Sequence, residues 1–225
     1  LSTVDPVAWA ELMFGFDDKS DTWSIRNYQK EQLRCSAQRL VVREGRRSGK
    51  TFAMALKLVY YAFNLAINKG YDSSGKEIVE GPEIMVVTPY QAQLTNIFNE
   101  IESLIKRNKE LAMQVTTGTA DSLYIKTPMF KMELKNGASI RGFVSGLGVK
   151  GDGSGGGTIR GQSADVIYLD EMDMIPEDIL DKVITPILLT KPGVMLTATS
   201  TPIGKRGKFY NWCLEREDFK EDYYP

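Results

Sequence analysis

Short apolar runs that do not alternate with polar residues recur along this chain, and segments of helical periodicity separate them. The apolar runs cover residues 39–43, 83–87, 164–169 and 194–198. The periodic segments cover residues 26–38, a long stretch after Gly49, and residues 90–106, 175–189 and 208–215. Buried strands separated by helices are typical of a parallel sheet. The pattern therefore predicts an α/β fold with a mainly parallel central sheet and helices on both faces.

Other segments depart from this alternation. Asn136-Gly137 lies between the strand-like residues 129–134 and 138–144, which predicts a β-hairpin with a type I′ turn. This hairpin is either an insertion or an antiparallel edge of the sheet. Residues 146–157 are rich in glycine and are expected to form a mobile loop. We divide the chain into an N-terminal preamble with a weak helical signal (1–27), a core (28–205) and the start of a C-terminal lid or linker (206–225).

The first apolar run leads directly into Gly45-Arg46-Arg47-Ser48-Gly49-Lys50-Thr51. In a phosphate-binding loop, backbone N–H groups at a helix N-terminus surround phosphate oxygens, a lysine neutralises the β- and γ-phosphates, and a Ser or Thr holds Mg²⁺. Lys50 and Thr51 fit the last two roles, so ATP and Mg²⁺ are expected. Glu44 occupies the position where the first glycine is usual. A chance Gly-Lys-Thr on a surface turn is the alternative, and the flanking strand and helix argue against it.

The run at residues 164–169 ends in Asp170-Glu171. Asp170 is expected to hold the Mg²⁺ shell, and Glu171 to polarise the attacking water as a general base. Alternation at the end of the strand would separate the two carboxylates. Such a pair is often only the solvated start of a loop, but the preceding Lys50 loop favours a functional role. A second acid at this place indicates an ATP hydrolase rather than a small-molecule kinase.

Four other groups of polar residues are candidates for the same site. Arg46 lies inside the loop and could touch the γ-phosphate, or it is a solvated arginine. Arg160 follows the glycine-rich loop and could act as an arginine finger, contact DNA phosphates or only carry surface charge. Thr199-Ser200-Thr201-Pro202 ends the fourth run and could sense the γ-phosphate, or it is a turn before proline. Tyr28-Gln29 could contact adenine or could pack a helix.

Composition limits the metals, membranes and nucleic acids with which the chain is expected to interact. Hydrophobic residues make up 42% of the 225 residues, charged residues make up 25%, and the net charge is −1. Histidine is absent and the two cysteines have no metal-ligand spacing, which excludes the usual zinc sites. No apolar run is long enough to span a bilayer, and the first residues do not form a signal peptide. Contact with DNA phosphates would need local basic groups, for which the candidates are Lys126, Lys131, Lys135, Arg141, Lys205, Arg206 and Lys208.

In this order the motifs resemble the ATPase domain of the large terminase subunit, the DNA-packaging motor of tailed bacteriophages. The resemblance runs from about Tyr28 to Trp212 and includes Ile159-Arg160-Gly161 and Thr199-Ser200-Thr201-Pro202-Ile203-Gly204. The late glycine in an arginine-rich phosphate loop is the pattern that this family prefers. The resemblance implies a P-loop NTPase fold of the RecA-like class. It also implies that Arg46 reaches the γ-phosphate, that Arg160 reaches a neighbouring subunit's site, and that residues 199–201 couple hydrolysis to movement.

The same resemblance implies partners and a location. Such motors assemble as homo-oligomeric rings, typically pentamers, on the portal protein of the procapsid in the host cytoplasm. They work with a small terminase subunit and pump double-stranded DNA without entering a membrane. A C-terminal nuclease is expected in the full-length protein and is not assigned to this chain, which begins at Leu1 and is expected to be a fragment. A helicase or translocase of superfamily 1 or 2, and a nucleotide-gated DNA-binding module, are the alternatives.

Overall fold

The computed structural model describes residues 4–15, 24–145, 159, 161–201, 203–215 and 218–224. The chain divides into two compact units. The first unit comprises Leu1–Cys35, Thr51–Ile84 and Ile97–Ile140, and the second unit comprises Ser36–Lys50, Met85–Asn96 and Arg141–Pro225. Each unit is thus built from segments that are distant in the sequence. The glycine-rich residues 146–157 and Arg160 lie outside the described residues.

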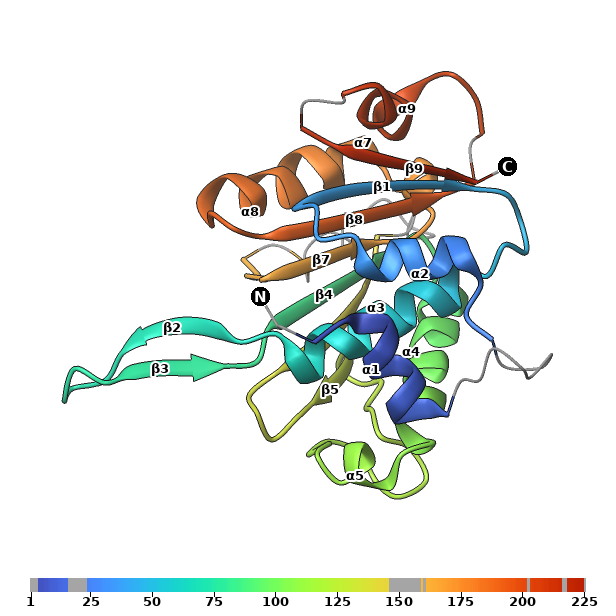
Figure 1. The fold of residues 1–225 in the computed structure, drawn as a ribbon. Coiled ribbons are helices and arrows are strands. Elements are labelled where there is room, and N and C mark those ends of the chain that lie inside the picture. Colours follow the sequence, from blue (N-terminus) through green and yellow to red (C-terminus); the bar gives the residue numbers. More distant parts are fainter. Residues whose placement is uncertain are drawn as a thin grey trace. The chain divides into compact units, whose positions relative to one another are not determined.

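Parallel strands form the core of the second unit (Figure 1). Strand β1 (Arg39–Glu44) pairs in parallel with β8 (Met195–Ser200) and with β9 (Lys220–Tyr224), and β8 pairs in parallel with β7 (Val166–Leu169). All of β7 and the centre of β1 are buried, as expected for strands that are covered on both faces. Parallel strands align their carboxyl ends at one edge, so the residues that follow β1, β7 and β8 come together there.

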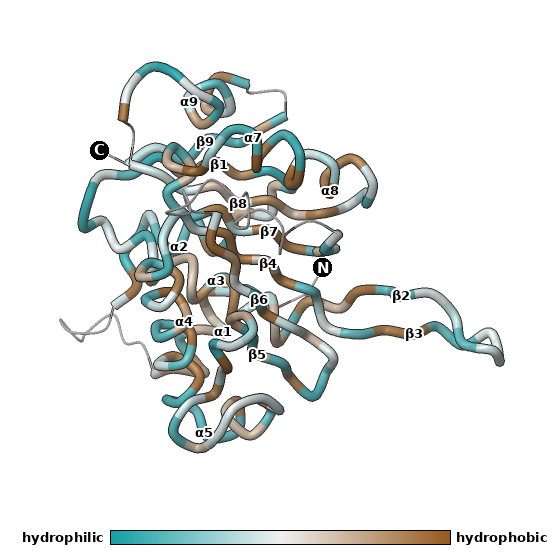
Figure 2. Tube along the Cα trace, turned by 180° about the vertical axis from the view of Figure 1, so that it is seen from behind, coloured by the Kyte–Doolittle hydropathy of each residue, from teal (hydrophilic) through white to brown (hydrophobic). Residues whose placement is uncertain are grey.

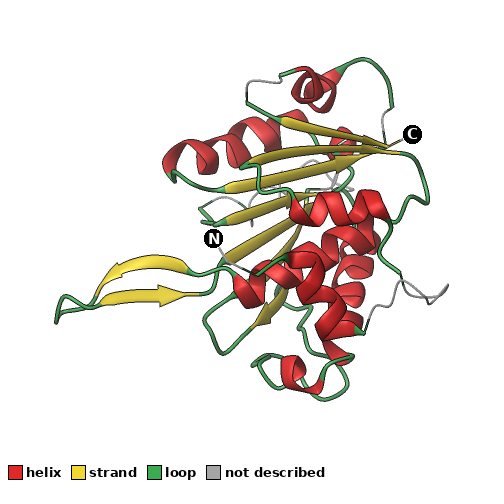
Figure 3. Cartoon of the chain, viewed as in Figure 1, coloured by secondary structure: helices red, strands yellow, loops and turns green. Residues whose placement is uncertain are grey.

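The complete sheet has seven strands in the order β5-β6-β4-β7-β8-β1-β9. The other strands are β4 (Glu83–Thr88), β5 (Phe130–Glu133) and β6 (Ser139–Val144). Hydrophobic residues colour much of β4 and β7 in Figure 2, and Figure 3 shows the strands together with the helices. The predicted α/β fold with a mainly parallel sheet is confirmed. All four apolar runs are strands, and the predicted hairpin provides strands at one edge of the sheet.

The turn of that hairpin differs from the prediction. A type I′ turn needs a positive φ at both central residues, but only Gly137 has one, with φ of 84°. The N–H of Gly137 donates to the carbonyl of Leu134 at 3.0 Å, and the N–H of Leu134 donates to the carbonyl of Ala138 at 2.9 Å. The loop therefore contains one more residue than a two-residue turn, with glycine in the left-handed position. The type I′ prediction was wrong because Asn136 uses its side chain instead, accepting from the N–H of Ala138 at 3.0 Å.

The segment between β7 and β8 is helical, as the periodicity predicted, but it is not one regular helix. It comprises a 3₁₀ turn η1 (Met172–Met174), helix α7 (Glu177–Ile179), a π-helical segment η2 (Leu180–Ile184) and helix α8 (Thr185–Thr190). Pro186 follows the π-helical segment within one helical stretch, and a proline there removes a helix hydrogen bond, which is a common cause of an irregular helix. The predicted helix at 208–215 is α9 (Gly207–Leu214).

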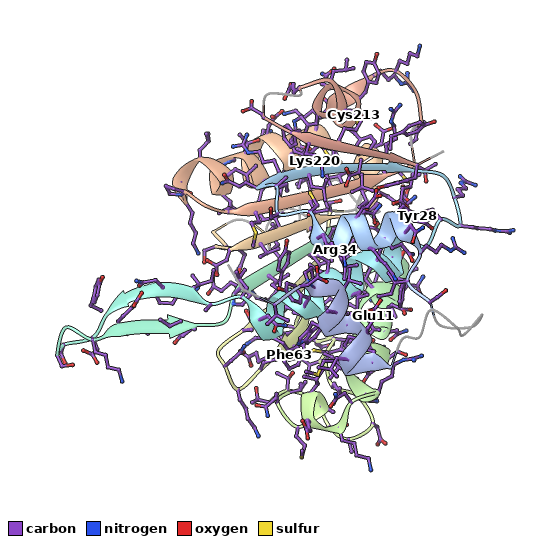
Figure 4. All side chains as sticks on the ribbon, in the orientation of Figure 1. Glu11, Tyr28, Arg34, Phe63, Cys213 and Lys220 are labelled. Carbon is purple, nitrogen blue, oxygen red and sulfur yellow. The ribbon has the colours of Figure 1, made fainter. Side chains whose placement is uncertain are left out.

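The first unit contains most of the remaining helices. They are α1 (Pro6–Phe14), α2 (Asn27–Arg34), α3 (Lys50–Asn64), α4 (Gln91–Lys106) and α5 (Lys109–Ala112), of which α3 and α4 begin in the second unit. Asp5 caps α1 and also accepts from the guanidinium of Arg34 on α2 at 2.8 Å. Lys30 of α2 pairs with Glu11 of α1 at 3.2 Å; Arg34 and Glu11 are labelled in Figure 4. None of the described helices has the length and apolar character required to cross a membrane.

A second, separate hairpin was not predicted. Strands β2 (Ile67–Tyr71) and β3 (Glu77–Glu80) pair antiparallel between α3 and β4. Asp72 forms the turn, since its carboxylate accepts from the N–H groups of Ser74 and Lys76 at 2.8 and 3.0 Å. All four residues of β3 are exposed. A hairpin without a buried face leaves no alternating apolar pattern, which is why the sequence did not reveal it.

Candidate active site

The segment between β1 and α3 is a tight loop at the carboxyl edge of the sheet. Arg47 and Gly49 both have left-handed backbones, with φ of 64° and 88°, so the loop turns sharply before α3 begins at Lys50. The Ser48 hydroxyl donates to the carboxylate of Glu44 at 2.5 Å. Glu44 is almost fully buried. Glu44, which replaces the usual first glycine, therefore holds the loop in place by a hydrogen bond from inside the second unit.

Lys50 connects this loop to the ends of two other strands. Its ammonium donates to the hydroxyl of Thr201 at 2.8 Å and lies 3.5 Å from a carboxylate oxygen of Glu171. It also lies 3.5 Å from the carbonyl oxygen of Glu44. Only 9% of the side chain is exposed. A buried ammonium needs partners, and here two of its partners are residues that the sequence had placed in the same site.

Asp170 follows β7 and is buried. One of its carboxylate oxygens, Oδ1, accepts from the hydroxyl of Tyr168 at 2.9 Å and from that of Thr199 at 3.0 Å. Burial raises the pKa of Asp170, and these hydrogen bonds oppose that shift. Burial also raises the pKa of the Tyr168 hydroxyl well above its usual value. A buried carboxylate of this kind would be stabilised by a nearby cation.

Glu171 turns away from Asp170. Its backbone is left-handed, with φ of 47° and ψ of 50°, and its Oε2 accepts from the N–H of Thr201 at 3.1 Å and from the hydroxyl of Ser200 at 3.3 Å. The two adjacent carboxylates thus have different partners. An uncommon conformation in a residue other than glycine is a feature of constrained, functional positions.

The structure therefore brings together Lys50, Asp170, Glu171 and residues 199–201, all of which the sequence had proposed. Arg46 and Arg47 are exposed on the loop, and Thr51 is half-buried in the first turn of α3. Arg160 and Pro202 lie outside the described residues. Among those that are described, no group of three or more His, Cys, Asp or Glu residues could hold a metal. A bound Mg²⁺ would need oxygens from phosphates or water as well.

The proposed adenine residues lie on α2, in the first unit. Gln29 is buried, and its side-chain oxygen accepts from the N–H of Arg26 at 3.0 Å. The hydroxyl of Tyr28 accepts from the guanidinium of Arg26 at 2.8 Å; Tyr28 is labelled in Figure 4. Gln29 therefore caps the start of α2, as the packing alternative anticipated, and a contact of either residue with adenine stays a prediction.

Several of the predicted DNA-binding groups have partners within the chain. Lys131 pairs with Glu133 at 2.7 Å, and Lys208 pairs with Asp181. The guanidinium of Arg141 donates to Gln162 and to the carbonyl of Ser163, each at 2.7 Å. The exposed cations among the candidates are Lys126, Lys135, Lys205 and Arg206. These four are the better positions for contact with phosphates.

Two features near the site were not inferred from the sequence. Tyr168 contacts Asp170 because residues two apart on a strand point to the same face, a signal that could have been read from the sequence. The second is a cavity of about 400 Å³ lined by Arg43, Phe209, Cys213 and Glu221, among others; Cys213 is labelled in Figure 4. Burial raises the pKa of Cys213 to about 11, so its thiol is a poor nucleophile.

A family model described as terminase large subunit, T4likevirus-type, N-terminal matches residues 41–221. The chain belongs to this family. The predicted resemblance to a large terminase ATPase domain is confirmed, since the match extends from β1 into β9. The search of curated proteins gives no match.

Solved structures agree with the fold of a terminase ATPase domain. The Thermus phage P74-26 large terminase ATPase domain is 20% identical with a TM-score of 0.66, covering 98% of this chain and 86% of that chain. The HK97 bacteriophage large terminase is 15% identical with a TM-score of 0.67, covering 100% of this chain and 44% of that chain. A hypothetical ATP-dependent RNA helicase from Sulfolobus tokodaii is 16% identical with a TM-score of 0.51, covering 97% and 56%. The P-loop NTPase fold is confirmed, and helicases share it.

Proposed function

We propose that this terminase domain binds ATP with Mg²⁺ and hydrolyses it at the cluster around Lys50. The observation that carries the proposal is that the Lys50 ammonium contacts both the Thr201 hydroxyl and the Glu171 carboxylate. A phosphate-binding cation, a candidate base and a candidate sensor from three separate segments therefore share one hydrogen-bonded network. The large terminase of a thermophilic bacteriophage has been solved in complex with ADP and with ATP-gamma-S, which supports the choice of nucleotide.

Each part of the phosphate loop has a proposed task. The backbone N–H groups of residues 45–50 surround the phosphates, and Lys50 leaves Thr201 to neutralise the β- and γ-phosphates. Arg46 is exposed and adds charge at the γ-phosphate. Tyr28 and Gln29 contact the adenine. Lys50 now binds the uncharged hydroxyl of Thr201 and the carboxylate of Glu171, which has other donors. Replacement of these two partners by phosphate oxygens therefore costs little.

Asp170 and Thr51 are the proposed Mg²⁺ ligands. Asp170 fits such a role because its carboxylate is buried and its described hydrogen bonds both end on Oδ1, so Oδ2 is the oxygen that would face the ion. When bound, Mg²⁺ supplies positive charge to the phosphate oxygens. Burial raises the pKa of Asp170, and a cation offsets the cost of keeping this carboxylate charged.

Glu171 is the proposed general base. Its carboxylate is fixed by the Thr201 N–H and the Ser200 hydroxyl. It accepts the proton of the attacking water as the water oxygen bonds to the γ-phosphorus, while the bond from the γ-phosphorus to the bridging oxygen breaks and ADP leaves. Because residues 199–201 hold both carboxylates and Lys50, any shift of this turn upon phosphate release moves the whole cluster. This is the proposed coupling of hydrolysis to movement.

Steady-state phosphate release tests the hydrolysis proposal. Glu171→Gln should lower the rate by roughly 100-fold or more while ATP binding is kept, since a general base contributes about 10²–10⁴-fold. The exposed Glu215→Gln is the control of equal charge change, and it should leave the rate as in the wild type. Equal rates in Glu171→Gln and wild type would refute Glu171 as the base. ATP binding by the wild type without measurable phosphate release would favour the alternative of a non-catalytic, nucleotide-gated module.

We further propose that hydrolysis drives double-stranded viral DNA into the procapsid. The domain would act in a homo-oligomeric ring, typically a pentamer, at the portal protein in the host cytoplasm, together with the small terminase subunit. The exposed Lys126, Lys135, Lys205 and Arg206 would contact DNA phosphates, so DNA binding should weaken steeply with salt. Arg160 would reach the neighbouring site, and mixing Arg160→Ala with Glu171→Ala subunits should then restore part of the activity under conditions of assembly.

The helicase alternative has one supporting observation, the shared fold of the Sulfolobus tokodaii helicase. The two functions differ in the nucleic acid that stimulates hydrolysis. A packaging motor should respond to double-stranded DNA, and a helicase to single strands. Stimulation by single-stranded DNA or RNA alone would favour the helicase.

A further inference from the structure

A buried tyrosine lies behind the carboxylate that we assign to Mg²⁺. Tyr168 is 1% exposed, and its hydroxyl lies 2.9 Å from Oδ1 of Asp170 and 3.0 Å from the hydroxyl of Thr199. The Thr199 hydroxyl in turn lies 3.0 Å from the same Oδ1. The three side chains therefore form a closed triangle of polar atoms in the interior of the second unit.

Strand geometry explains why these residues meet. Tyr168 and Asp170 are two residues apart along β7, so their side chains point to the same face. The parallel register aligns Tyr168 with Thr197 and Leu169 with Ala198, which brings Asp170 beside Thr199 on the adjacent strand. Because backbone pairing sets the positions of all three, the triangle belongs to the sheet and not to a flexible loop.

Counting hydrogens shows what the triangle does to the carboxylate. The two hydroxyls carry one hydrogen each, and an ionised carboxylate carries none. If both hydrogens stay within the triangle, they cannot both lie on the Tyr168–Thr199 contact. At least one must therefore point to Oδ1 of Asp170. The carboxylate is then held against rotation by one or two hydrogen bonds, always through the same oxygen.

We propose that Tyr168 is a positioning residue, which together with Thr199 orients the Asp170 carboxylate so that Oδ2 faces the Mg²⁺ of the bound nucleotide. The inference rests on the proposed function. The torsion that turns a carboxylate is soft and broadly distributed, so a ligand without such partners would lose orientation on binding its ion. Partners behind metal ligands commonly contribute 10- to 100-fold in metal affinity.

Tyr168→Phe tests this role, because it keeps the ring in the core and removes only the hydroxyl. Equilibrium binding of a fluorescent ATP analogue would be measured over a series of Mg²⁺ concentrations, and again in EDTA. The Mg²⁺ concentration for half-maximal effect should rise by about 10-fold or more, while binding in EDTA stays at the wild-type value. Thr199→Val should shift the Mg²⁺ dependence in the same direction.

Tyr124→Phe is the matched control. Tyr124 is also buried, at 4% exposure, and its hydroxyl donates to the side chain of Asn99 at 2.7 Å in the first unit. Tyr124→Phe likewise removes a buried, hydrogen-bonded hydroxyl, and it should leave the Mg²⁺ dependence unchanged. A purely structural role of Tyr168 would make the two tyrosine variants behave alike.

The outcomes separate this inference from the proposed function. If Asp170→Asn shifts the Mg²⁺ dependence and Tyr168→Phe does not, the positioning role is overturned while Asp170 remains the ligand. If Asp170→Asn has no effect either, the proposed Mg²⁺ site itself is wrong. If Tyr168→Phe does not fold, Thr199→Val decides, and an unchanged Mg²⁺ dependence in that folded variant overturns the proposal.

Discussion

Helix α3 contains two buried lysines whose surroundings differ in kind. Lys50, at its first residue, contacts the side chains of Thr201 and Glu171. Lys57, further along, is 3% exposed and donates to two backbone carbonyls, those of Gln32 at 2.7 Å and Cys35 at 2.9 Å. These carbonyls belong to the C-terminal end of α2, where a positive charge is favourable.

The difference teaches how one helix serves both stability and function. The two carbonyls that bind Lys57 are fixed in place by the backbone of α2, so these contacts join α3 to α2 as part of the fold of the first unit. The contacts of Lys50 with Thr201 and Glu171 are to side chains, its contact with the Glu44 carbonyl is long at 3.5 Å, and Glu171 has further donors in Ser200 and Thr201. A phosphate can therefore take the place of these side chains. Burial of a lysine is thus no guide to its role unless its partners are known.

The largest expected effect is that of Lys50→Met on hydrolysis. Loss of a cation that stabilises the developing phosphoryl charge should lower phosphate release by at least about 100-fold. The fold should be retained, since Glu171 keeps its donors from Ser200 and Thr201. Steady-state phosphate release and chemical denaturation measure the two quantities. A rate within twofold of the wild type would contradict the distinction between the two lysines.

Lys57→Met should lower stability and leave hydrolysis unchanged, the opposite of Lys50→Met. The carbonyls of Gln32 and Cys35 would lose a buried donor, so the free energy of unfolding should fall by about 1–3 kcal/mol. The rate of ATP hydrolysis per folded molecule should stay at the wild-type value. Denaturation of Lys57→Met and of the exposed control Lys109→Met measures the difference. Equal stability of both variants would show that the buried contacts of Lys57 contribute nothing net.

The sequence predicted those parts of the fold whose pattern is local. The strands β1, β4, β7 and β8 are runs of apolar residues, and α3 and α4 have a strong helical period. Strand β9 escaped prediction because Lys-Glu-Asp-Tyr-Tyr has no apolar pattern. It is held by backbone pairing with β1 and by the ion pair of Glu221 with Arg43 at 2.8 Å. Neither contact leaves a local signal.

The candidate site was predicted from motifs whose chemistry is local as well. Lys50, Asp170 and Glu171 each follow or precede a recognisable strand, so their meeting at one sheet edge could be expected. The individual atomic contacts could not be expected from the sequence. The contact of Lys50 with Thr201 and the triangle around Tyr168 depend on strand register. Gln29 had two predicted roles, contact with adenine and helix packing; its side chain accepts from the N–H of Arg26 at the start of α2, and the contact with adenine stays a prediction.

A third test extends the comparison to a side chain that, like Lys57, binds backbone. Asp5 accepts from the N–H groups of Val7 and Ala8 at 3.0 and 2.9 Å, and Asp5→Ala should lower the free energy of unfolding by about 1 kcal/mol. The hydrogen bond from Arg34 holds the pKa of Asp5 below its ordinary value. Its contribution should therefore be present above about pH 4 and be lost as pH falls through the lowered pKa.

The measurement is denaturation of wild type and Asp5→Ala from about pH 2 to about pH 7. The difference in stability should shrink toward acid pH, because protonated Asp5 no longer binds the guanidinium as an ion. A difference independent of pH would show that the cap acts without its charge. Phosphate release at neutral pH should be unchanged, since Asp5 contacts Val7, Ala8 and Arg34, none of which is proposed to contact the nucleotide.

The smallest expected effect concerns Cys213 of the second unit. Its labelling tests whether a reagent can reach buried groups outside the Lys50 cluster. Burial raises the pKa of this thiol to about 11, so only about 1 in 1,000 molecules would carry the thiolate at pH 8. Alkylation by iodoacetamide, followed by mass spectrometry, should therefore be slow in the folded protein and rapid after denaturation. Rapid labelling of folded protein would show that α9 opens readily. The second unit would then open well beyond the phosphate loop. In that case the difference between Lys50 and Lys57 would come from the units in which they lie and not from their individual partners.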